Sequence, residues 1–223
     1  MGKSRIRITD DGSHTLLSDI SGETYHSSFG AIQESEHIFI KAGLLEFLNN
    51  SIDYLRILEV GTGTGLNVLL TYKYTENKGV KVDYDGYEPY PLVNEERDSL
   101  NYCKILDMDK DIFKSIHSFE DDGISISDLF NFTNTRQKIE DSNLPDSYYN
   151  LVYFDAFSPD SQPELWDKSV FMKIFNSLMP GGILLTYSCK GTVKRALKGV
   201  GFKIEKLPGP PGKREFLRAT RPL

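Results

Sequence analysis

Three glycines at alternate positions, Gly61, Gly63 and Gly65, follow directly on an apolar stretch at 57–60 and precede a helix-compatible segment at 66–74. Residues without a Cβ atom permit a tight turn and a close approach of the backbone to a ligand. The order of apolar strand, glycine-rich turn and helix is typical of sites where a nucleotide-like group lies over the helix N-terminus. The pattern predicts a cofactor site at this turn and leaves the identity of the cofactor open.

Length and apolar content limit the architecture. The chain has 223 residues, of which 39% are hydrophobic, and this is enough for one substantial core but not for two. We therefore expect a single domain over 1–223, in which 1–50 forms an N-terminal extension over the site and 51–223 forms the core.

Several classes of protein are disfavoured. Two cysteines, Cys103 and Cys189, cannot make a disulfide framework, which favours a reducing compartment. Residues 1–20 lack the apolar core of a secretory signal, and no apolar run approaches the length of a membrane span. The four histidines show no paired ligand spacing and no Cys-x-x-Cys occurs. The expectation is a cytoplasmic protein with no membrane partner and no metal.

The charge of the chain is unevenly distributed. Net charge is −6, yet residues 190–221 hold ten Lys or Arg against Glu205 and Glu215, a local balance of +8 that leaves −14 on the remainder. Such asymmetry can mark a nucleic-acid footprint on an acidic protein. A solvated helix and an edge strand kept soluble by lysines would give the same pattern. Charge alone does not separate the two interpretations.

Alternating periodicities predict the order of the elements. Strands are expected at 56–60, 81–87, 124–128, 150–156, 181–188, 201–207 and 215–221. Helices are expected at 36–50, 65–76, 91–102, 108–118, 164–178 and 190–199. The polar, turn-rich segment at 130–146 is expected to be an extended helix or a loop at the rim.

This order predicts an α/β fold with a doubly wound, Rossmann-like sheet. Strands separated by helices pair in parallel through right-handed crossovers. Only 208–214 separates the last two strands, which is too short for a helical crossover and suits an antiparallel pairing. A mostly parallel sheet with an antiparallel last strand is the architecture of class I S-adenosylmethionine methyltransferases, whereas a dinucleotide dehydrogenase would more often continue in parallel units.

Acidic residues at the ends of the first three strands are candidates for cofactor binding. Glu59 precedes the glycine turn, and Glu88 closes the second strand, where a carboxylate can accept both ribose hydroxyls. NAD and S-adenosylmethionine enzymes share that arrangement. The dinucleotide fingerprint needs a glycine where Leu66 stands, so the spacing favours S-adenosylmethionine. Asp128 ends the third expected strand and could accept from the adenine amino group or cap the next helix.

A second segment, Asp155-Ala-Phe-Ser-Pro159, follows the fourth expected strand. Asp155 would lie beside the strand-order switch point, placed to hold or deprotonate a nucleophilic nitrogen in line with a methyl donor. Phe157 and Pro159 could form an apolar platform for a planar base. The alternative is that the segment is only a turn and that the nearby Trp166 is core packing, and we expect the latter for Trp166.

An ordered set of motifs resembles the methyltransferase domain of MnmC and its standalone relatives, sometimes called MnmD. The set comprises Tyr25-His-Ser27, Gly30, Glu34-Ser35, Ile38-Phe-Ile40, Gly61-Thr-Gly-Thr-Gly-Leu-Asn67, Tyr87-Glu-Pro-Tyr-Pro-Leu92, Ser127-Asp128, Phe154-Asp-Ala-Phe-Ser-Pro159, Pro163-Glu-Leu-Trp166, Pro180-Gly-Gly182, Thr186-Tyr-Ser188 and Lys213-Arg-Glu215. It runs from about 23 to 219. The chain departs from the family's usual residues at Thr62, where Phe is usual, and at Ala156 and Ser158, which are small.

The resemblance implies a function. That family makes the last methylation of 5-methylaminomethyl-2-thiouridine at the tRNA wobble position, so S-adenosyl-L-methionine is the implied cofactor and the tRNA anticodon loop the implied partner. The chain is too short to include the flavin-dependent oxidase domain of bifunctional members. Methyl transfer to an aminomethyl uridine made by other enzymes, with a possible separate oxidase upstream, is therefore implied. Oligomeric state stays open.

The resemblance also implies roles for individual residues. Asp155 would be the catalytic residue. Cofactor binding is expected from Glu59, Gly61, Gly63, Gly65, Glu88, Asp128 and Ser27. Acceptor binding is expected from Tyr25, Glu34, Phe157, Pro159 and Tyr187, with Lys190, Arg195, Lys213 and Arg214 as candidates for tRNA phosphates. Glu34 could equally be a surface helix cap.

Two other functions remain compatible with the sequence. Overall acidity favours a methyltransferase for a small amine or a protein side chain, with activity independent of RNA. A non-enzymatic adenosyl-nucleotide binder would use the same fold, but it would not need a carboxylate at Asp155.

Overall fold

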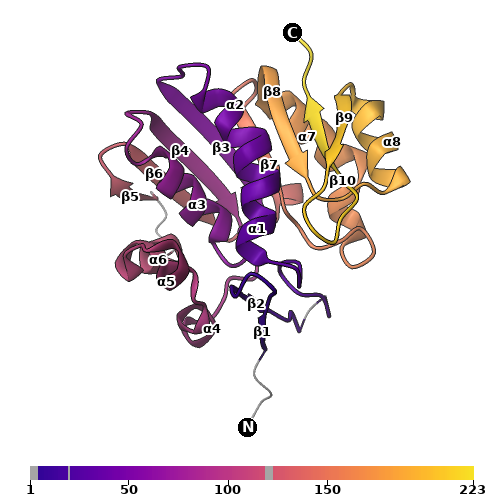
Figure 1. Cartoon of the computed structure of the whole chain (residues 1–223). Coiled ribbons are helices and arrows are strands. Elements are labelled where there is room, and N and C mark those ends of the chain that lie inside the picture. The colour runs from indigo at the N-terminus through magenta and orange to yellow at the C-terminus, as the bar shows by residue number, and fades with distance from the viewer. Residues whose placement is uncertain (1–4, 20, 119–122) are drawn as a thin grey trace.

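An eight-stranded sheet forms the centre of the molecule (Figure 1). The computed structural model describes residues 5–19, 21–118 and 123–223. The sheet contains β3 (Tyr54–Val60), β4 (Lys81–Tyr87), β5 (Ile124–Ser127), β6 (Phe130–Thr135), β7 (Tyr149–Phe154), β8 (Leu178–Thr186), β9 (Lys203–Pro208) and β10 (Glu215–Thr220). Their order is β5-β6-β4-β3-β7-β8-β10-β9.

The pairing confirms the predicted architecture. Parallel ladders join β6, β4, β3, β7 and β8. The last strand, β10, runs antiparallel between β8 and β9. The connection between β9 and β10 is 209–214, and its short length gives the antiparallel hairpin predicted for this part of the chain. The carboxyl ends of the parallel strands therefore meet at one edge of the sheet, where ligands bind in open α/β folds.

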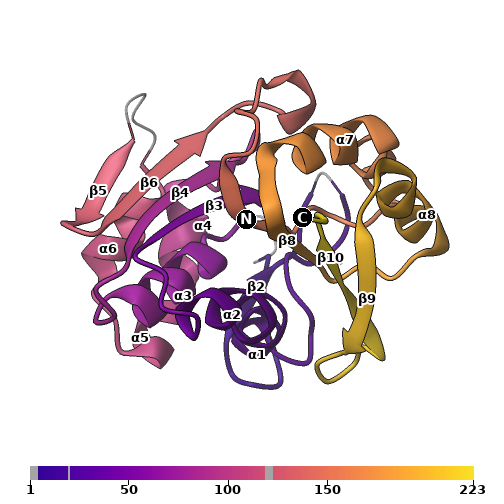
Figure 2. The same ribbon diagram turned by 90° about the horizontal axis from the view of Figure 1, so that it is seen from above.

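Helices cover both faces of the sheet (Figure 2). One face carries a continuous helical segment made of α1 (Ala31–Ser35), the π-helical η1 (Glu36–Leu44) and α2 (Leu45–Leu48), together with α3 (Leu66–Thr75), α5 (Tyr102–Leu106) and α6 (Lys110–Ile116). The other carries α7 (Lys168–Ser177) and α8 (Gly191–Val200), with the 3-10 turns η2 (Ile139–Asp141) and η3 (Pro163–Trp166). The short α4 (Asn94–Ser99), which has no buried residue, lies below the sheet in Figure 1. None of the helices in the described residues is long and apolar enough to cross a membrane.

The N-terminal segment is held against the cofactor half of the sheet. Its hairpin, β1 (Ile6–Ile8) with β2 (His14–Leu16), lies below the sheet in Figure 1. The Asn101 side chain ties the hairpin to the entrance of α5, since it accepts from the His14 amide at 2.8 Å and donates to the Gly12 carbonyl at 2.9 Å. The chain then passes over the carboxyl edge of the sheet before α1 begins.

The third parallel strand is not the one predicted. Residues 124–127 do form a strand, but β5 is antiparallel to β6 and lies at the edge of the sheet. The neighbour of β4 is β6, within a segment we expected to be a helix or loop. Its alternation of buried Phe130 and Phe132 with Asn131 and Thr133 is a strand pattern that its polar composition concealed.

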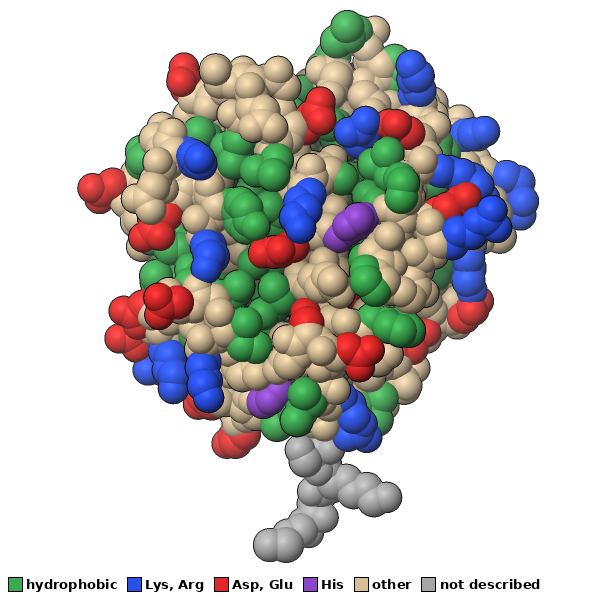
Figure 3. All heavy atoms as spheres, viewed as in Figure 1, with side chains coloured by type: hydrophobic (Ala, Val, Ile, Leu, Met, Phe, Trp, Pro, Cys, Tyr) green, Lys and Arg blue, Asp and Glu red, His purple; other side chains and the backbone are tan. Residues whose placement is uncertain are grey.

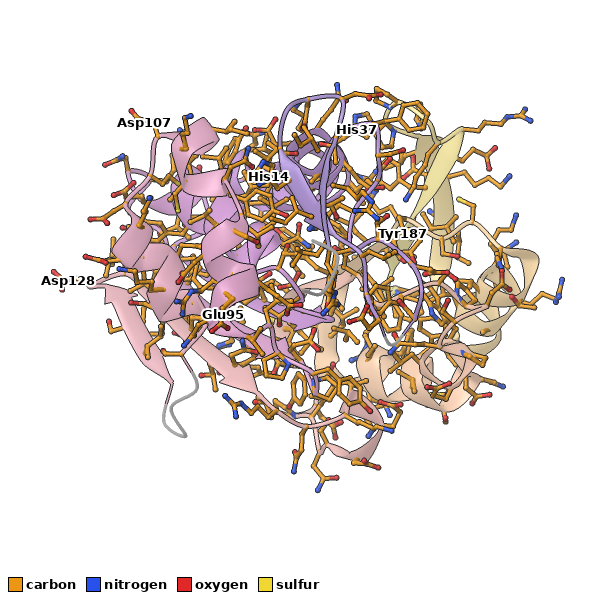
Figure 4. The ribbon with its side chains drawn as sticks, turned by 90° about the horizontal axis from the view of Figure 1, so that it is seen from below. His14, His37, Glu95, Asp107, Asp128 and Tyr187 are labelled. Atoms are coloured by element: carbon orange, nitrogen blue, oxygen red, sulfur yellow. The ribbon has the colours of Figure 1, made fainter. Side chains whose placement is uncertain are left out.

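Asp128 is consequently misplaced in the prediction. It lies in the turn between β5 and β6, and Phe130 pairs with Val82 at the start of β4. Asp128 is therefore at the amino end of the parallel strand, at the edge opposite Glu88. Figure 4 shows it on the periphery, far from Tyr187.

Candidate functional site

A cavity of about 510 Å³ opens at the carboxyl edge of the sheet. Its volume lies within the range of small-molecule sites. Its walls come from the N-terminal segment, from the loops after β3, β4, β7 and β8, from the segment after β6 and from the β9–β10 turn. Of the predicted site residues, it is lined by Tyr25, Ser27, Glu34, Gly61, Gly63, Glu88, Asp155, Phe157, Tyr187 and Lys213.

The glycine turn needs its glycines. Gly61 has φ 85°, and a Cβ there would lie 2.8 Å from the Asp155 carbonyl oxygen. Gly63 has φ 49°, and a Cβ there would lie 2.9 Å from the Tyr25 ring. Gly65, with φ 72°, is the N-cap of α3. All three adopt left-handed backbone conformations that other residues rarely take. The turn can thus bring the backbone close to a ligand in the cavity.

Glu88 follows β4 and lies beside the glycine turn. Its Oε2 accepts from the Gly63 amide at 2.8 Å and its Oε1 from the Tyr90 amide at 2.9 Å. Burial raises the pKa of this carboxyl, and the two backbone hydrogen bonds oppose that shift. Each oxygen keeps a further lone pair for the cavity, so a vicinal diol fits. Thr62 Oγ1 and Asn134 Oδ1 are buried nearby without hydrogen-bond partners among the described residues.

Asp155 follows β7 and enters the cavity beside the glycine turn. Its backbone amide donates to the Val60 carbonyl at 2.9 Å, which extends the β3–β7 ladder by one step. Its Oδ2 accepts from the Asn67 side chain at 2.9 Å. Burial, reinforced by the Glu34 carboxylate, raises the pKa of Asp155 to about 7. A carboxylate of that basicity is suited to accept a proton near neutral pH.

Glu34 and Lys213 meet inside the cavity. Glu34, in α1, accepts from the Ser27 amide at 2.8 Å and lies 2.5 Å from Lys213 Nζ. That ammonium also stands 4.1 Å from the centroid of the Tyr187 ring, a cation–π contact. The Tyr187 hydroxyl donates to the Ala156 carbonyl at 2.9 Å. The β9–β10 turn is thus connected to the loop that holds Asp155.

The N-terminal segment packs against the glycine turn and completes the wall on that side. The Tyr25 and Phe157 rings are 5.0 Å apart in an edge-to-face arrangement. Glu23 joins the segment to the loop after β7. Its carboxylate accepts from the Ser158 amide at 3.0 Å and from the Ser158 hydroxyl at 2.5 Å. Buried His26 is 2.7 Å from the Thr64 hydroxyl, and burial lowers its pKa to about 4, so it is neutral at pH 7.

Other predicted site residues lie outside the cavity lining. Glu59 is completely buried behind the glycine turn, and Gly65 and Pro159 do not line the cavity. Lys190 forms an ion pair with Asp160 on the surface. Asp128 cannot reach an adenine bound beside Glu88, because it lies at the opposite edge of the sheet. Lys138, Ile139 and Glu140, which follow β6, line the cavity on that side instead.

Lys213 and Arg214 are both predicted to contact phosphates, but their side chains lie in different environments. Lys213 points into the cavity and pairs with Glu34, whereas Arg214 is exposed. Arg195 is also exposed, on α8. Figure 3 shows Lys and Arg gathered on the side of the molecule formed by α8 and β9.

Sequence reasoning missed several cavity residues. Glu23, His26 and Tyr90 line the cavity, and Asn67 supports Asp155 from behind. His26 and Asn67 were part of the motifs that carry the resemblance, although no role was given to them. Asn67 also had a local signal, since an amide in the first turn of a helix that follows a buried strand must find partners. Glu23 had no local sequence signal, because its hydrogen-bond partner Ser158 lies 135 residues away.

A match to a protein family identifies the class of enzyme. The family model described as S-adenosyl-L-methionine-dependent methyltransferase matches residues 110–222. The chain belongs to this methyltransferase family. Its cofactor is S-adenosyl-L-methionine, and the turn of three glycines, the buried Glu88 and the cavity between them fit that group. Among the described residues, no group of three or more His, Cys, Asp or Glu is placed to hold a metal ion.

Two relatives of the chain carry a more specific name. The methyltransferase is 32% identical over 218 residues to the tRNA 5-methylaminomethyl-2-thiouridine biosynthesis bifunctional protein MnmC of Leptospira interrogans, covering 91% of this chain and 33% of that protein. It is 26% identical to the protein of the same name from Aromatoleum aromaticum, covering 96% and 35%. The chain thus spans about a third of these curated relatives.

A solved structure is similar over the whole chain. The crystal structure of MnmC2 from Aquifex aeolicus superposes with a TM-score of 0.81 at 25% identity, covering 100% of this chain and 73% of that one.

Proposed function

We propose that this protein methylates the primary amine of 5-aminomethyl(-2-thio)uridine at the wobble position of tRNA. The observation that carries the proposal is Asp155, a carboxylate with raised pKa that faces the cavity beside the glycine turn and Glu88. The names of the MnmC relatives support the choice of acceptor. A tRNA substrate places the reaction in the cytoplasm, and a separate oxidase or another enzyme must supply the aminomethyl group.

The reaction needs an uncharged amine. An alkyl ammonium has no lone pair, so its proton must leave before or during attack. S-adenosyl-L-methionine supplies a methyl group on a sulfonium, whose positive charge already activates it. Asp155 binds the acceptor ammonium, takes its proton and directs the freed lone pair. The products would be a secondary amine and S-adenosylhomocysteine. Positioning by the cavity provides much of the rate.

The remaining lining groups suit a splayed base. Tyr25, Phe157 and Tyr187 offer aromatic surfaces on which an unstacked base of a loop can lie. Glu34 and Lys213 place one negative and one positive group at the acceptor side, so they can hold polar edges of the uracil and its aminomethyl group. Ser27 anchors Glu34 through its backbone amide, and the Glu23–Ser158 contact holds the wall closed.

The decisive experiment is incubation of the protein with S-adenosyl-L-methionine and tRNA that carries unmethylated 5-aminomethyl uridine, followed by nucleoside mass spectrometry. We expect a gain of one methyl group on that nucleoside. The matched control is the same tRNA without the aminomethyl group, which should gain none. Cofactor binding without any gain on the aminomethyl nucleoside would refute the proposed acceptor.

A small amine or a protein side chain is the second candidate acceptor. Several basic residues on the α8–β9 side are neutralised by ion pairs, including Lys206 with Glu215 and Arg218 with Glu205, which reduces the field available for RNA. This alternative predicts equal methylation of a free aminomethyl nucleoside and of the tRNA, whereas a tRNA enzyme favours the tRNA.

We expect the double replacement Arg195→Ala with Arg214→Ala to weaken tRNA binding and flatten its salt dependence. Both residues are exposed, and removing two phosphate-binding charges should lower the magnitude of the slope of log K against log salt by about 1.4–1.8. Filter binding between about 50 and 200 mM salt measures this slope. The exposed Lys104→Ala, on α5, is the control and should leave it unchanged. An unchanged slope in the double variant would assign both arginines to the solvated surface.

A further inference from the structure

A buried polar cluster lies behind the cavity and contacts Asp155 from the side away from the acceptor. Asn67, in the first turn of α3, donates from Nδ2 to Glu59 Oε1 at 2.7 Å and to Asp155 Oδ2 at 2.9 Å. The Tyr84 hydroxyl contacts the other oxygen of Glu59 at 2.8 Å. One amide therefore joins two carboxyl groups from neighbouring strands, and Asp155 Oδ1 is left for the cavity.

The sheet register brings these carboxyl groups together. Glu59 on β3 pairs with Tyr153 on β7, and Asp155 is two residues further along. Side chains two apart on a strand project from the same face, and paired residues of parallel neighbours do so as well. Glu59 and Asp155 consequently share the face that α3 covers, with Asn67 between them.

Glu59 has no cationic partner among the described residues. Its side chain is 0% exposed and both of its hydrogen-bond partners, Asn67 and Tyr84, are uncharged. The charged group that Asn67 connects to it is another carboxylate. Removing a carboxylate from water without a cation costs several kcal/mol, so such a group takes up a proton instead. In agreement, burial raises the pKa of Glu59 to about 8, with a contribution from the nearby Asp155, although the hydrogen bonds from Asn67 and Tyr84 oppose the shift.

We propose that Asn67 and Glu59 are positioning residues for Asp155: the amide directs the carboxylate at the acceptor nitrogen, and Glu59, as an uncharged acid, anchors the amide without adding a second anion. This inference rests on the proposed function for its acceptor. An ionised Glu59 would stabilise the acceptor as an ammonium and hold its proton in place. An aliphatic side chain at either position would leave the Asp155 carboxylate free to rotate.

Other groups also face Asp155. From the surrounding elements these are Glu34 of α1, Lys213 of the β9–β10 turn, Tyr187 after β8 and Tyr84 of β4. Burial and Glu34 raise the pKa of Asp155, while the Asn67 hydrogen bond and Lys213 lower it. Loss of the Asn67 amide should therefore raise this pKa further, because a hydrogen bond to the charged form disappears.

The first test is Asn67→Ala. We expect the acid limb of kcat/KM to move to higher pH by about one unit, together with a fall in kcat. The pKa of Asp155, measured by carboxyl-13C NMR titration without acceptor, should rise by a similar amount. The control, Thr71→Val, removes a hydroxyl that donates to the Asn67 carbonyl at 2.7 Å one turn along α3. It should lower Tm without moving either titration. A fall in kcat with no titration shift in Asn67→Ala would reduce Asn67 to a structural residue and overturn the proposal.

The second test separates an uncharged Glu59 from an anionic one. Glu59→Ala should lower kcat by tenfold or more, and the conservative Glu59→Gln should recover it to within about threefold of the wild type. A raised pKa in the folded state means that stability is fully present below the unfolded value of about 4.5 and is lost as pH rises towards 8. Thermal unfolding should thus show Glu59→Gln gaining on the wild type across that window.

The opposite results would contradict the proposal. Glu59→Gln as impaired as Glu59→Ala, or a stability gain that shrinks as pH rises, would show that Glu59 acts as an anion. The NMR and unfolding readouts need no acceptor and remain informative if the tRNA assay yields no methylated nucleoside. That negative result would count against the proposed function alone.

Discussion

Replacement of Asp155 by Asn is expected to lower the rate of methyl transfer by about 10³-fold, within the range for loss of a general base. Asn keeps the size of the side chain and an oxygen that can accept from Asn67, so the loop after β7 should hold its position. The amide cannot take the acceptor's proton or bind its ammonium as an ion pair. Single-turnover methylation of aminomethyl uridine tRNA measures the loss, and calorimetry should show cofactor affinity within about threefold of the wild type.

The matched control is Asp160→Asn, in the same loop. Asp160 is exposed and pairs with Lys190 on the surface, so this change should leave the rate unaltered. Because the pKa of Asp155 is raised to about 7, the wild-type kcat/KM should fall as pH drops through that value. Normal turnover by Asp155→Asn would remove Asp155 from the mechanism and would favour deprotonation of the amine by solvent.

Replacement of Glu88 by Gln is expected to raise the Kd for S-adenosyl-L-methionine by about 100-fold. The carboxylate accepts backbone N–H groups from Gly63 and Tyr90 with its two oxygens. A Gln would turn its NH₂ group towards one of these donors and would offer fewer acceptors to the ribose hydroxyls. Hydrogen bonds to charged groups contribute about 1.5–3 kcal/mol each, and about 2.7 kcal/mol corresponds to that factor.

Calorimetric titration with the cofactor measures the effect of Glu88→Gln. The control is Glu95→Gln, because Glu95 is exposed in the first turn of α4 and lies outside the cavity lining. Unchanged affinity in Glu88→Gln would mean that the ribose is held elsewhere, and the segment after β6 would become the next candidate.

Local patterns predicted the elements well where strands are apolar and helices regular. The glycine turn, its leading strand and α3 were read from a single run of about twenty residues, since short-range backbone preferences decide them. The same reasoning failed at β6, because Asn131, Thr133 and Asn134 gave it the composition of a loop. Phe130 and Phe132 form a strand there only because β4 supplies a buried face to pack against.

The error at β6 also displaced a site residue. The prediction took 124–128 as the third parallel strand, and this placed Asp128 at the cofactor edge of the sheet. The true third strand ends at Thr135, which pairs with Tyr87, so the cavity is lined by Lys138, Ile139 and Glu140. A strand at the edge of a sheet can run in either direction, and the sequence of β5 contains no signal for which.

The sequence by itself determined the parallel sheet, the cofactor turn and the candidate base Asp155, because each depends on a continuous stretch of chain whose periodicity and turn residues decide its form. Only the tertiary structure decided what surrounds that base. Asn67 reaches Asp155 across 88 residues of sequence, and Lys213 leaves its neighbour Arg214 to pair with Glu34 of α1. Such contacts are set by strand register and helix packing, and neither is encoded in the residues adjacent to them.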